Sequence, residues 1–321
     1  MISRTEAVFI LKLQPHWCTM KNILLAILLL SACNSDQKAD LTYDTSVTNP
    51  AYTSLHPEVL FDEAHKNFHT STGRYAPFVN LIRNDGYDAS ANKEPFSPNS
   101  LAGYHILVIS NAKGMNEKYG PAFTDEECDA VKTWVESGGS LLLIADHYPM
   151  GSAAQPLALR FGIRMNNGYV SDSINYEGDS GFKDQLVFSR SNGMLKDHAI
   201  MEGRDASERI SKVVTFTGQS LKGPTEAIVL LELAPSAAEA IPDSIWKIDG
   251  NTYTRFQDPV PIPGRCQGLV MNFGKGRVVV LGEAAMLTAQ IEDGRKFGMN
   301  VPGNDNRQFA LNIMHWLSGL L

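Results

Sequence analysis

The stretch that decides the fold is FTDEECDAVKTWVESGGSLLLIADH, which covers residues 123–147. Thr124 and Glu127 make the T-x-x-E pattern that caps the start of a helix, and Val131 and Val135 lie on the inner face of that helix. The Gly-Gly pair that follows ends the helix. The run SLLLIA after it is continuously apolar, as strands buried on both faces of a parallel sheet are. The segment therefore predicts one helix–strand unit of a layered α/β fold.

The same alternation continues on both sides of this unit. Upstream we expect strands at 58–62 (EVLFD) and 105–110 (HILVIS), with a helix at 74–84 and a further strand from Tyr87 between them. Downstream, the apolar pattern at about 153–161 predicts another helix. Strands that alternate with helices in this way predict an open, doubly wound, mostly parallel sheet.

The remainder of the chain has a different pattern. Residues 164–260 contain short β-rich pieces among polar loops, and we expect an insertion or an elaborated sheet edge there. A hairpin is predicted from strands 268–273 and 277–281 joined by Gly-Lys-Gly, followed by a helix at 306–317. We therefore expect one α/β domain over residues 58–321.

The composition is that of an ordinary globular protein. Of the 321 residues, 43% are hydrophobic and 20% are charged, which excludes collagen-like, coiled-coil, disordered and multi-span membrane chains. The length suits one large domain or two modest ones, since a single core stops growing at roughly 250–300 residues. The formal net charge of −7 lacks the basic surplus of nucleic-acid-binding proteins, so we expect no nucleic-acid partner.

Residues 20–33 (MKNILLAILLLSAC) have the layout of a secretory signal, with Lys21 before a short apolar run and then small residues. The sequence LSAC that ends at Cys33 resembles the lipobox of bacterial lipoproteins, in which the cysteine is acylated, as with palmitate, and becomes the mature N-terminus. We therefore expect residues 1–32 to be an upstream extension and a signal peptide that are removed, and Cys33 to be lipidated. A non-lipidated signal or an ordinary N-terminal helix is the alternative.

The residues after Cys33 indicate where in the cell the protein is expected. By resemblance to known lipoproteins, Asn34 in place of Asp favours the outer membrane over retention in the inner one. Residues 33–57 are polar and lack apolar periodicity, so we expect a tether that lets the domain stand off the lipid surface. The expected location is the bacterial cell envelope, with the lipid anchor as the membrane partner and the domain facing the periplasm.

Two cysteines besides Cys33 would remain in the mature chain. Cys128 lies on the apolar side of its predicted helix, so we expect a buried thiol there. The sequence does not decide whether Cys128 and Cys266 form a disulfide. No C-x-x-C or Cys/His ligand spacing occurs, which excludes a zinc site of the finger type.

Polar side chains follow three of the predicted strands at the point where each strand ends. Because the carboxyl ends of parallel strands meet at one edge of a sheet, where open α/β folds bind ligands, we expect these side chains to lie together. Carboxylates and imidazoles in one place suit general acid–base chemistry, metal binding or the binding of a small molecule. The residues concerned are Asp62, Glu63, His65, His69, Asp146, His147, Glu283 and Gln290.

These residues have different expected roles. His147, Asp146 and Glu283 are the candidate catalytic residues, with His147 first because imidazole exchanges protons near neutral pH. His65 and His69 are four residues apart, would share one face of a helix and could hold a divalent metal. The alternative is that the cluster only caps helices and binds loop backbone. The candidate ligand-binding residues are Asp62, Glu63, His65, His69 and Gln290.

Three segments carry a resemblance to the class I glutamine amidotransferase-like superfamily. They are FDEAHKNFHT (61–70), the stretch 123–147, and GEAAM (282–286) with the final predicted helix. More specifically, the chain resembles an uncharacterised bacterial branch that is kin to auxiliary proteins of gliding-type transporters and to the N-terminal domain of an intraflagellar transport component. The resemblance covers most of 58–163 and 265–321, and it implies a flavodoxin-like sheet.

True amidotransferases place a nucleophilic cysteine on a sharp strand–helix turn, backed by a histidine and a carboxylate. The comparable strand ends of this chain are Ser110-Asn111 and Asp146-His147, and no cysteine lies there. The resemblance therefore implies the fold and argues against glutaminase chemistry. We expect a domain that binds a small ligand, a glycan or a protein partner at this edge. The alternative is a periplasmic hydrolase that uses the His/Asp/Glu cluster, with or without a divalent metal.

Overall fold

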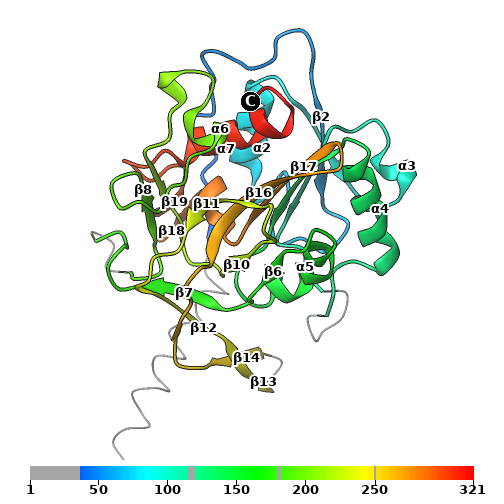
Figure 1. The fold of residues 1–321 in the computed structure, drawn as a ribbon. Helices are drawn as coiled ribbons and strands as arrows, with labels where there is room; N and C mark the ends of the chain where they lie inside the picture. Colours follow the sequence, from blue (N-terminus) through cyan, green and yellow to red (C-terminus); the bar gives the residue numbers. More distant parts are fainter. Residues whose placement is uncertain (1–36, 115–119, 179–181, 249–250) are drawn as a thin grey trace, which may run out of the picture.

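Five parallel strands form the centre of the fold. The structure is a computed structural model that describes residues 37–114, 120–178, 182–248 and 251–321 (Figure 1). The parallel strands are β2 (Glu58–Asp62), β3 (Asp88–Asn92), β4 (Ile106–Ser110), β5 (Ser140–Ile144) and β17 (Gly276–Leu281). Their order across the sheet is β3-β2-β4-β5-β17, which is the 2-1-3-4-5 order of flavodoxin-like folds. The predicted doubly wound, mostly parallel sheet is confirmed.

Antiparallel strands extend this sheet beyond β17. β16 (Cys266–Phe273) pairs with β17 as the predicted hairpin requires. The sheet then continues with β10 (Leu221–Lys222), β6 (Arg164–Met165) and β11 (Ile228–Glu232). Residues 164–260 thus build an elaborated sheet edge. Smaller sheets hold β7 (Tyr169–Asp172), β8 (Val187–Ser189), β9 (Lys212–Val214), β12 (Ala237–Ala240), β13 (Pro242–Ile248), β14 (Asn251–Phe256), β15 (Val260–Pro261), β18 (Ala289–Glu292) and β19 (Arg295–Gly298).

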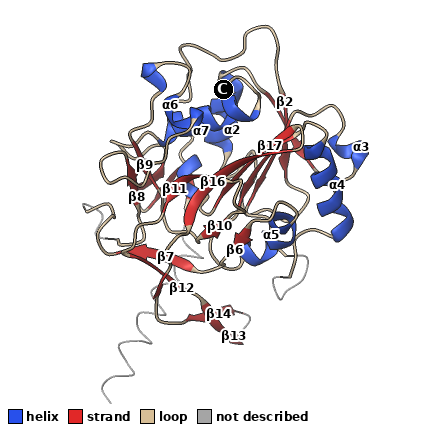
Figure 2. Cartoon of the chain, viewed as in Figure 1, coloured by secondary structure: helices blue, strands red, loops and turns tan. Residues whose placement is uncertain are grey.

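Helices cover both faces of the sheet (Figure 2). One face is covered by α2 (Ala76–Asn84) and α7 (Asn306–Leu317), and the other by α4 (Asp125–Glu136) and α5 (Met150–Leu159). The capping box predicted at the start of α4 is present. The short helical pieces are α3 (Pro98–Leu101), α6 (Ala199–Glu202), η2 (Ala206–Glu208) and η3 (Ala285–Leu287).

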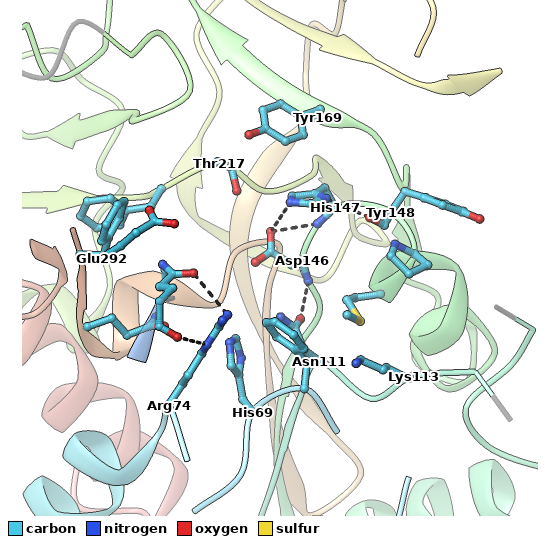
Figure 3. Close-up of a pocket in the computed structure, with 18 residues that line it drawn as sticks. His69, Arg74, Asn111, Lys113, Asp146, His147, Tyr148, Tyr169, Thr217 and Glu292 are labelled. Atoms are coloured by element: carbon cyan, nitrogen blue, oxygen red, sulfur yellow. Dashed lines mark hydrogen bonds and ion pairs between the residues drawn. The ribbon is translucent and has the colours of Figure 1, made fainter. Parts of the chain in front are cut away.

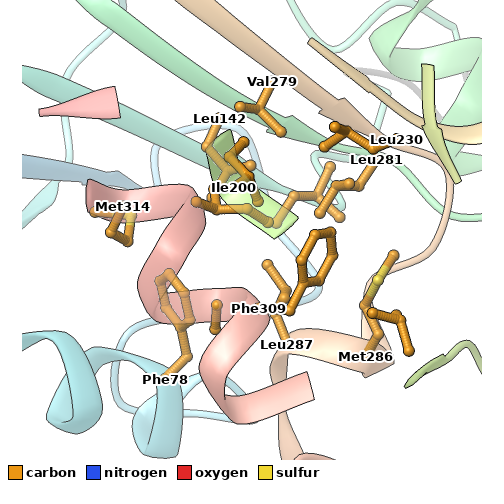
Figure 4. Packing of buried hydrophobic residues seen from close by; sticks show 14 of the residues in the cluster. Phe78, Leu142, Ile200, Leu230, Val279, Leu281, Met286, Leu287, Phe309 and Met314 are labelled. Carbon is orange, nitrogen blue, oxygen red and sulfur yellow. The ribbon is translucent and has the colours of Figure 1, made fainter. Parts of the chain in front are cut away.

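Successive strand residues point into opposite layers of the core. Leu142 packs in the cluster that holds Phe78 of α2 and Phe309 of α7 (Figure 4). Its neighbour Leu143 packs in the other cluster, with Val131 of α4. Each of these side chains is fully buried, which stabilises the fold by about 1.5–3 kcal/mol per residue. This two-sided burial explains the unbroken apolar runs of the central strands.

The described part of the expected tether, residues 37–57, is packed on the domain, which corrects the prediction of a free tether there. β1 (Lys38–Ala39) pairs antiparallel with β18. Further along, the backbone N–H of Ala51 donates to the carboxylate of Asp85. Tyr43, Val47 and Tyr52 also pack against the hydrophobic core. Three apolar side chains spread among polar residues leave no periodic pattern, so the sequence concealed this packing.

Residues 1–36, which contain the predicted signal and Cys33, lie outside the described residues. Within the described ranges, no helix combines the length and the apolar character that crossing a bilayer takes. Cys128 in α4 and Cys266 in β16 are both buried free thiols, so the buried thiol expected at Cys128 is confirmed.

Candidate functional site

A cavity of about 340 Å³ lies at the carboxyl edge of the parallel strands (Figure 3). Its size falls in the range of small-molecule sites. One wall comes from the residues that follow β4 and β5, and another from the loop after β2. The remaining walls come from β7, the turn before β10, and the β18–β19 hairpin. The cavity therefore opens where flavodoxin-like folds bind their ligands.

The structure divides the predicted site residues into two groups. Those that line the cavity are His69, Asp146, His147 and Gln290. Those that do not line it are Asp62, Glu63, His65 and Glu283. The second group lies at the ends of β2 and β17 as expected, but other parts of the fold hold each of these side chains.

His65 joins two carboxylates in a buried cluster. Its Nδ1 lies 2.9 Å from Asp62 and its Nε2 lies 2.8 Å from Oε1 of Glu127, while the rings of Phe96 and Phe123 pack against it. Burial lowers the pKa of His65, but the hydrogen bonds and charges of Asp62 and Glu127 outweigh it and raise the pKa above its ordinary value. Both ring nitrogens are occupied, so the cluster fastens the loop after β2 to α4.

The predicted metal pair is not formed. His65 and His69 lie in a loop between β2 and α2, so the helix face that their spacing suggested does not exist. Within the described ranges, no group of three or more His, Cys, Asp or Glu side chains is placed to hold a metal ion. Glu63 is also occupied, because it accepts hydrogen bonds from Ser71 and pairs with Lys93.

Glu283 does not line the cavity but holds the turn that does. Its two carboxyl oxygens accept the backbone N–H groups of Ala285 at 2.6 Å and Met286 at 2.8 Å. Complete burial, together with the nearby negative charge of Asp146, raises the pKa of Glu283 well above its ordinary value. The contacts position the turn after β17, which presents Ala285 to the cavity.

His69 is a neutral imidazole on the cavity wall. Burial, helped by the positive charges of Arg74 and Lys113, lowers its pKa to about 3. Its Nδ1 lies 3.0 Å from Oγ of Ser110, and in the described part of the chain its Nε2 has no hydrogen-bond partner. His69 thus keeps one ring nitrogen for a ligand.

Asn111 links the ends of β4 and β5. It has a left-handed backbone, with φ of 48°, which Asn adopts more readily than most residues. Its Oδ1 accepts the backbone N–H of Asp146 at 2.8 Å. The amide nitrogen of Asn111 is therefore the end of the side chain that remains for the cavity, and it has no partner among the residues described.

Asp146 and His147 form an adjoining acid–imidazole pair. Oδ1 of Asp146 accepts the backbone N–H of His147 at 2.9 Å and lies 4.0 Å from its Nε2. Nδ1 of His147 donates to the carbonyl of Tyr148 at 2.9 Å, which leaves the lone pair of neutral His147 on Nε2. The ring packs against Tyr169 with centroids 4.8 Å apart.

Sequence reasoning missed several residues of the cavity. Asn111 directly follows a predicted strand, and that position was the available signal. Thr217 lies in the turn before β10 with a φ of 95°, a conformation that β-branched residues rarely adopt and that no sequence pattern indicates. Glu292 and Phe297 come from the β18–β19 hairpin, which the apolar pattern did not reveal.

Comparisons with known proteins bear on the fold. No protein-family model and no curated protein matches this sequence. Among solved structures, the mmIFT52 N-terminal domain matches with a TM-score of 0.55 at 18% identity, over 81% of this chain and 97% of that one. A Bacteroides uniformis protein described as ThuA-like matches with a TM-score of 0.39 at 13% identity, over 84% of this chain and 93% of that one.

A Thermoplasma acidophilum protein described as a component of GMP synthase matches with a TM-score of 0.42 at 12% identity, over 84% of this chain and 97% of that one. At such identities a likeness concerns the fold alone. The likeness to the mmIFT52 domain agrees with the fold that the resemblance implied. This chain therefore has a flavodoxin-like fold, with the cavity at the carboxyl edge of its parallel strands.

Proposed function

We propose that the protein is a lipid-anchored envelope protein whose amidotransferase-like domain binds a small ligand in this cavity without glutaminase chemistry. The observation that carries the proposal is that Oε1 of Gln290, a buried atom of a residue that lines the cavity, has no hydrogen-bond partner within the described residues. A buried polar atom without a hydrogen bond costs about 1–3 kcal/mol, and a ligand that satisfies it recovers that free energy.

The absence of a thiol from this edge supports binding rather than glutaminase chemistry. Asn111 directly follows β4, and Asp146 lies two residues after the end of β5; neither can act as the cysteine nucleophile of an amidotransferase. Both described cysteines belong to the core, and burial raises the pKa of Cys128 to about 11 and of Cys266 to about 12. Such thiols are protonated and inert near neutral pH.

A hydrolase is the second candidate, and one observation favours it. Nδ1 of His147 donates to the carbonyl of Tyr148, which leaves the lone pair of the neutral ring on Nε2, and a histidine with a free lone pair on a cavity wall could act as a general base toward water. Glu283 weakens this candidate, because its oxygens accept backbone N–H groups and it does not line the cavity.

A ligand screen on the full-length protein tests the proposal. We expect compounds from a library of neutral and charged metabolites to raise the melting temperature of the wild type. The Gln290→Met variant removes the unpartnered acceptor at similar volume and should weaken binding, whereas Gln257→Met, at an exposed position, should not. The absence of any binding compound would refute the proposal, and turnover of a bound compound would favour the hydrolase.

A further inference from the structure

We propose that the ligand of this cavity is a neutral saccharide of one or two rings, recognised by the side chains of His69, Asn111 and Gln290. This inference rests on the proposed binding function and names the class of ligand. Three independent features of the wall support it: the balance of charge, the fixed direction of the unpartnered polar atoms, and the aromatic surface.

The charges on the wall cancel. Among the described lining residues, Arg74 and Lys113 are cationic and Asp146 and Glu292 are anionic. Figure 3 shows Arg74 and Lys113 below Asp146, with Glu292 on the opposite wall from Lys113. His69 adds no charge, since its pKa is far below neutrality. A wall without net charge favours a ligand without net charge, because a buried unpaired ion is costly.

Gln290 presents a fixed hydrogen-bond acceptor. The hydroxyl of Thr288 donates to the carbonyl of Ala285 at 2.7 Å, so its oxygen accepts from Nε2 of Gln290 at 2.6 Å. That bond determines which end of the side-chain amide is the nitrogen. It leaves Oε1 without a partner among the described residues, on a residue that is only 1% exposed. A ligand that brings a donor to this atom satisfies it.

His69 presents a second polar group. Its Nδ1 lies 3.0 Å from Oγ of Ser110, and burial lowers its pKa to about 3, so the ring is neutral near neutral pH. Nε2 is therefore the ring nitrogen that remains for a ligand, and it accepts or donates a hydrogen bond according to the tautomer.

Asn111 presents a donor of equally fixed direction. Because its Oδ1 accepts the N–H of Asp146, its Nδ2 is the end that remains for the ligand. A ligand that uses all three groups accepts a hydrogen bond from Asn111, donates one to Gln290 and makes one of either direction with His69. A hydroxyl group both donates and accepts, so a polyhydroxylated molecule meets these demands with one kind of group.

The apolar part of the wall suits a sugar ring. Tyr169 packs on His147. Phe216 and Phe297 pack edge to face on the wall of the cavity, with their ring centroids 5.8 Å apart. Aromatic rings supply rigid surface for the C–H face of a saccharide while polar groups bind its rim. A purely aliphatic ligand would leave the polar groups of Asn111, Gln290 and His69 unsatisfied.

The test uses the full-length protein in a detergent without a sugar headgroup. Calorimetry against neutral mono- and disaccharides should find at least one that binds. The uronic acid and the amino sugar of the same configuration should bind with an affinity at least about tenfold lower. Gln290→Met should weaken saccharide binding about tenfold, the loss of one well-placed hydrogen bond, whereas Gln257→Met should not change it.

A second variant, Glu292→Gln, keeps the test informative if Gln290→Met does not fold. Glu292→Gln removes a negative charge from a half-buried wall residue and should strengthen binding of the uronic acid more than binding of the neutral sugar. Binding of charged or flat aromatic compounds without any saccharide would overturn the saccharide assignment and leave the proposed binding function intact. If no compound of any class binds the cavity, the proposed function fails with it.

Discussion

The backbone N–H of Asp146 donates a 2.8 Å hydrogen bond to Oδ1 of Asn111, a residue 35 positions earlier in the chain. The bond joins the carboxyl ends of β4 and β5, which are parallel neighbours in the sheet. It orients the amide of Asn111 and holds the start of the Asp146-His147 segment. One side chain thus connects the geometry of the sheet to the polar groups of the cavity.

Replacement of Asn111 should therefore reduce both stability and binding. Asn111→Ala loses the hydrogen bond to a backbone N–H and places a Cβ residue at a positive φ, which we expect to cost about 2–4 kcal/mol of unfolding free energy in total. Asn111→Gly loses the same bond but tolerates the backbone, so it should cost about 1–2 kcal/mol less than the alanine variant. Urea denaturation measures both, and equal losses would contradict the role of the backbone conformation.

His147 should matter for the ligand far more than for the fold. Its ring is partly exposed and its Nδ1 bonds only to the adjoining carbonyl of Tyr148, so His147→Ala should change the melting temperature little. Binding, or turnover if there is any, should fall at least tenfold. His56→Ala is the matched control at an exposed histidine. A large loss of stability with unchanged binding would show that His147 is structural.

Lipidation of Cys33 remains a prediction from the sequence. Mass spectrometry of the N-terminus of the membrane-extracted protein should find an acylated Cys33 as the first residue. Cys33→Ser should leave the chain uncleaved and without the lipid. The variant keeps every residue that lines the cavity, so it should bind the ligand as the wild type does. An unmodified N-terminus upstream of Cys33 in the wild type would contradict the prediction.

The sequence predicted the sheet well because burial on both faces leaves an unambiguous apolar run, as in Leu141 to Ile144. It also predicted correctly that polar residues after parallel strands share one edge. It could not predict which of them face the cavity. Asp62 and His65 turn away because Glu127, from a helix 62 residues after His65, binds the imidazole. Contacts between residues so far apart in the chain leave no local pattern.

The cluster of His65 with Asp62 and Glu127 should make stability depend on pH. The folded pKa of His65 is raised above its ordinary value of 6.5, so its contribution is fully present below that value and is lost as pH rises through the folded pKa. The pKa of Glu127 is lowered despite burial, by its hydrogen bonds to Thr124 and His65, so its contribution is lost as pH falls through the lowered value.

The unfolding free energy should accordingly be greatest between these two pKa values and should decline on the alkaline side within the range where His65 loses its proton. His65→Gln keeps a polar side chain that does not titrate, so the alkaline decline should flatten and the maximum should fall. His56→Gln, at an exposed histidine, should leave the profile unchanged. Urea denaturation across a series of pH values measures all three proteins. If the wild type and His65→Gln show parallel profiles, His65 does not bridge the two carboxylates as a cation.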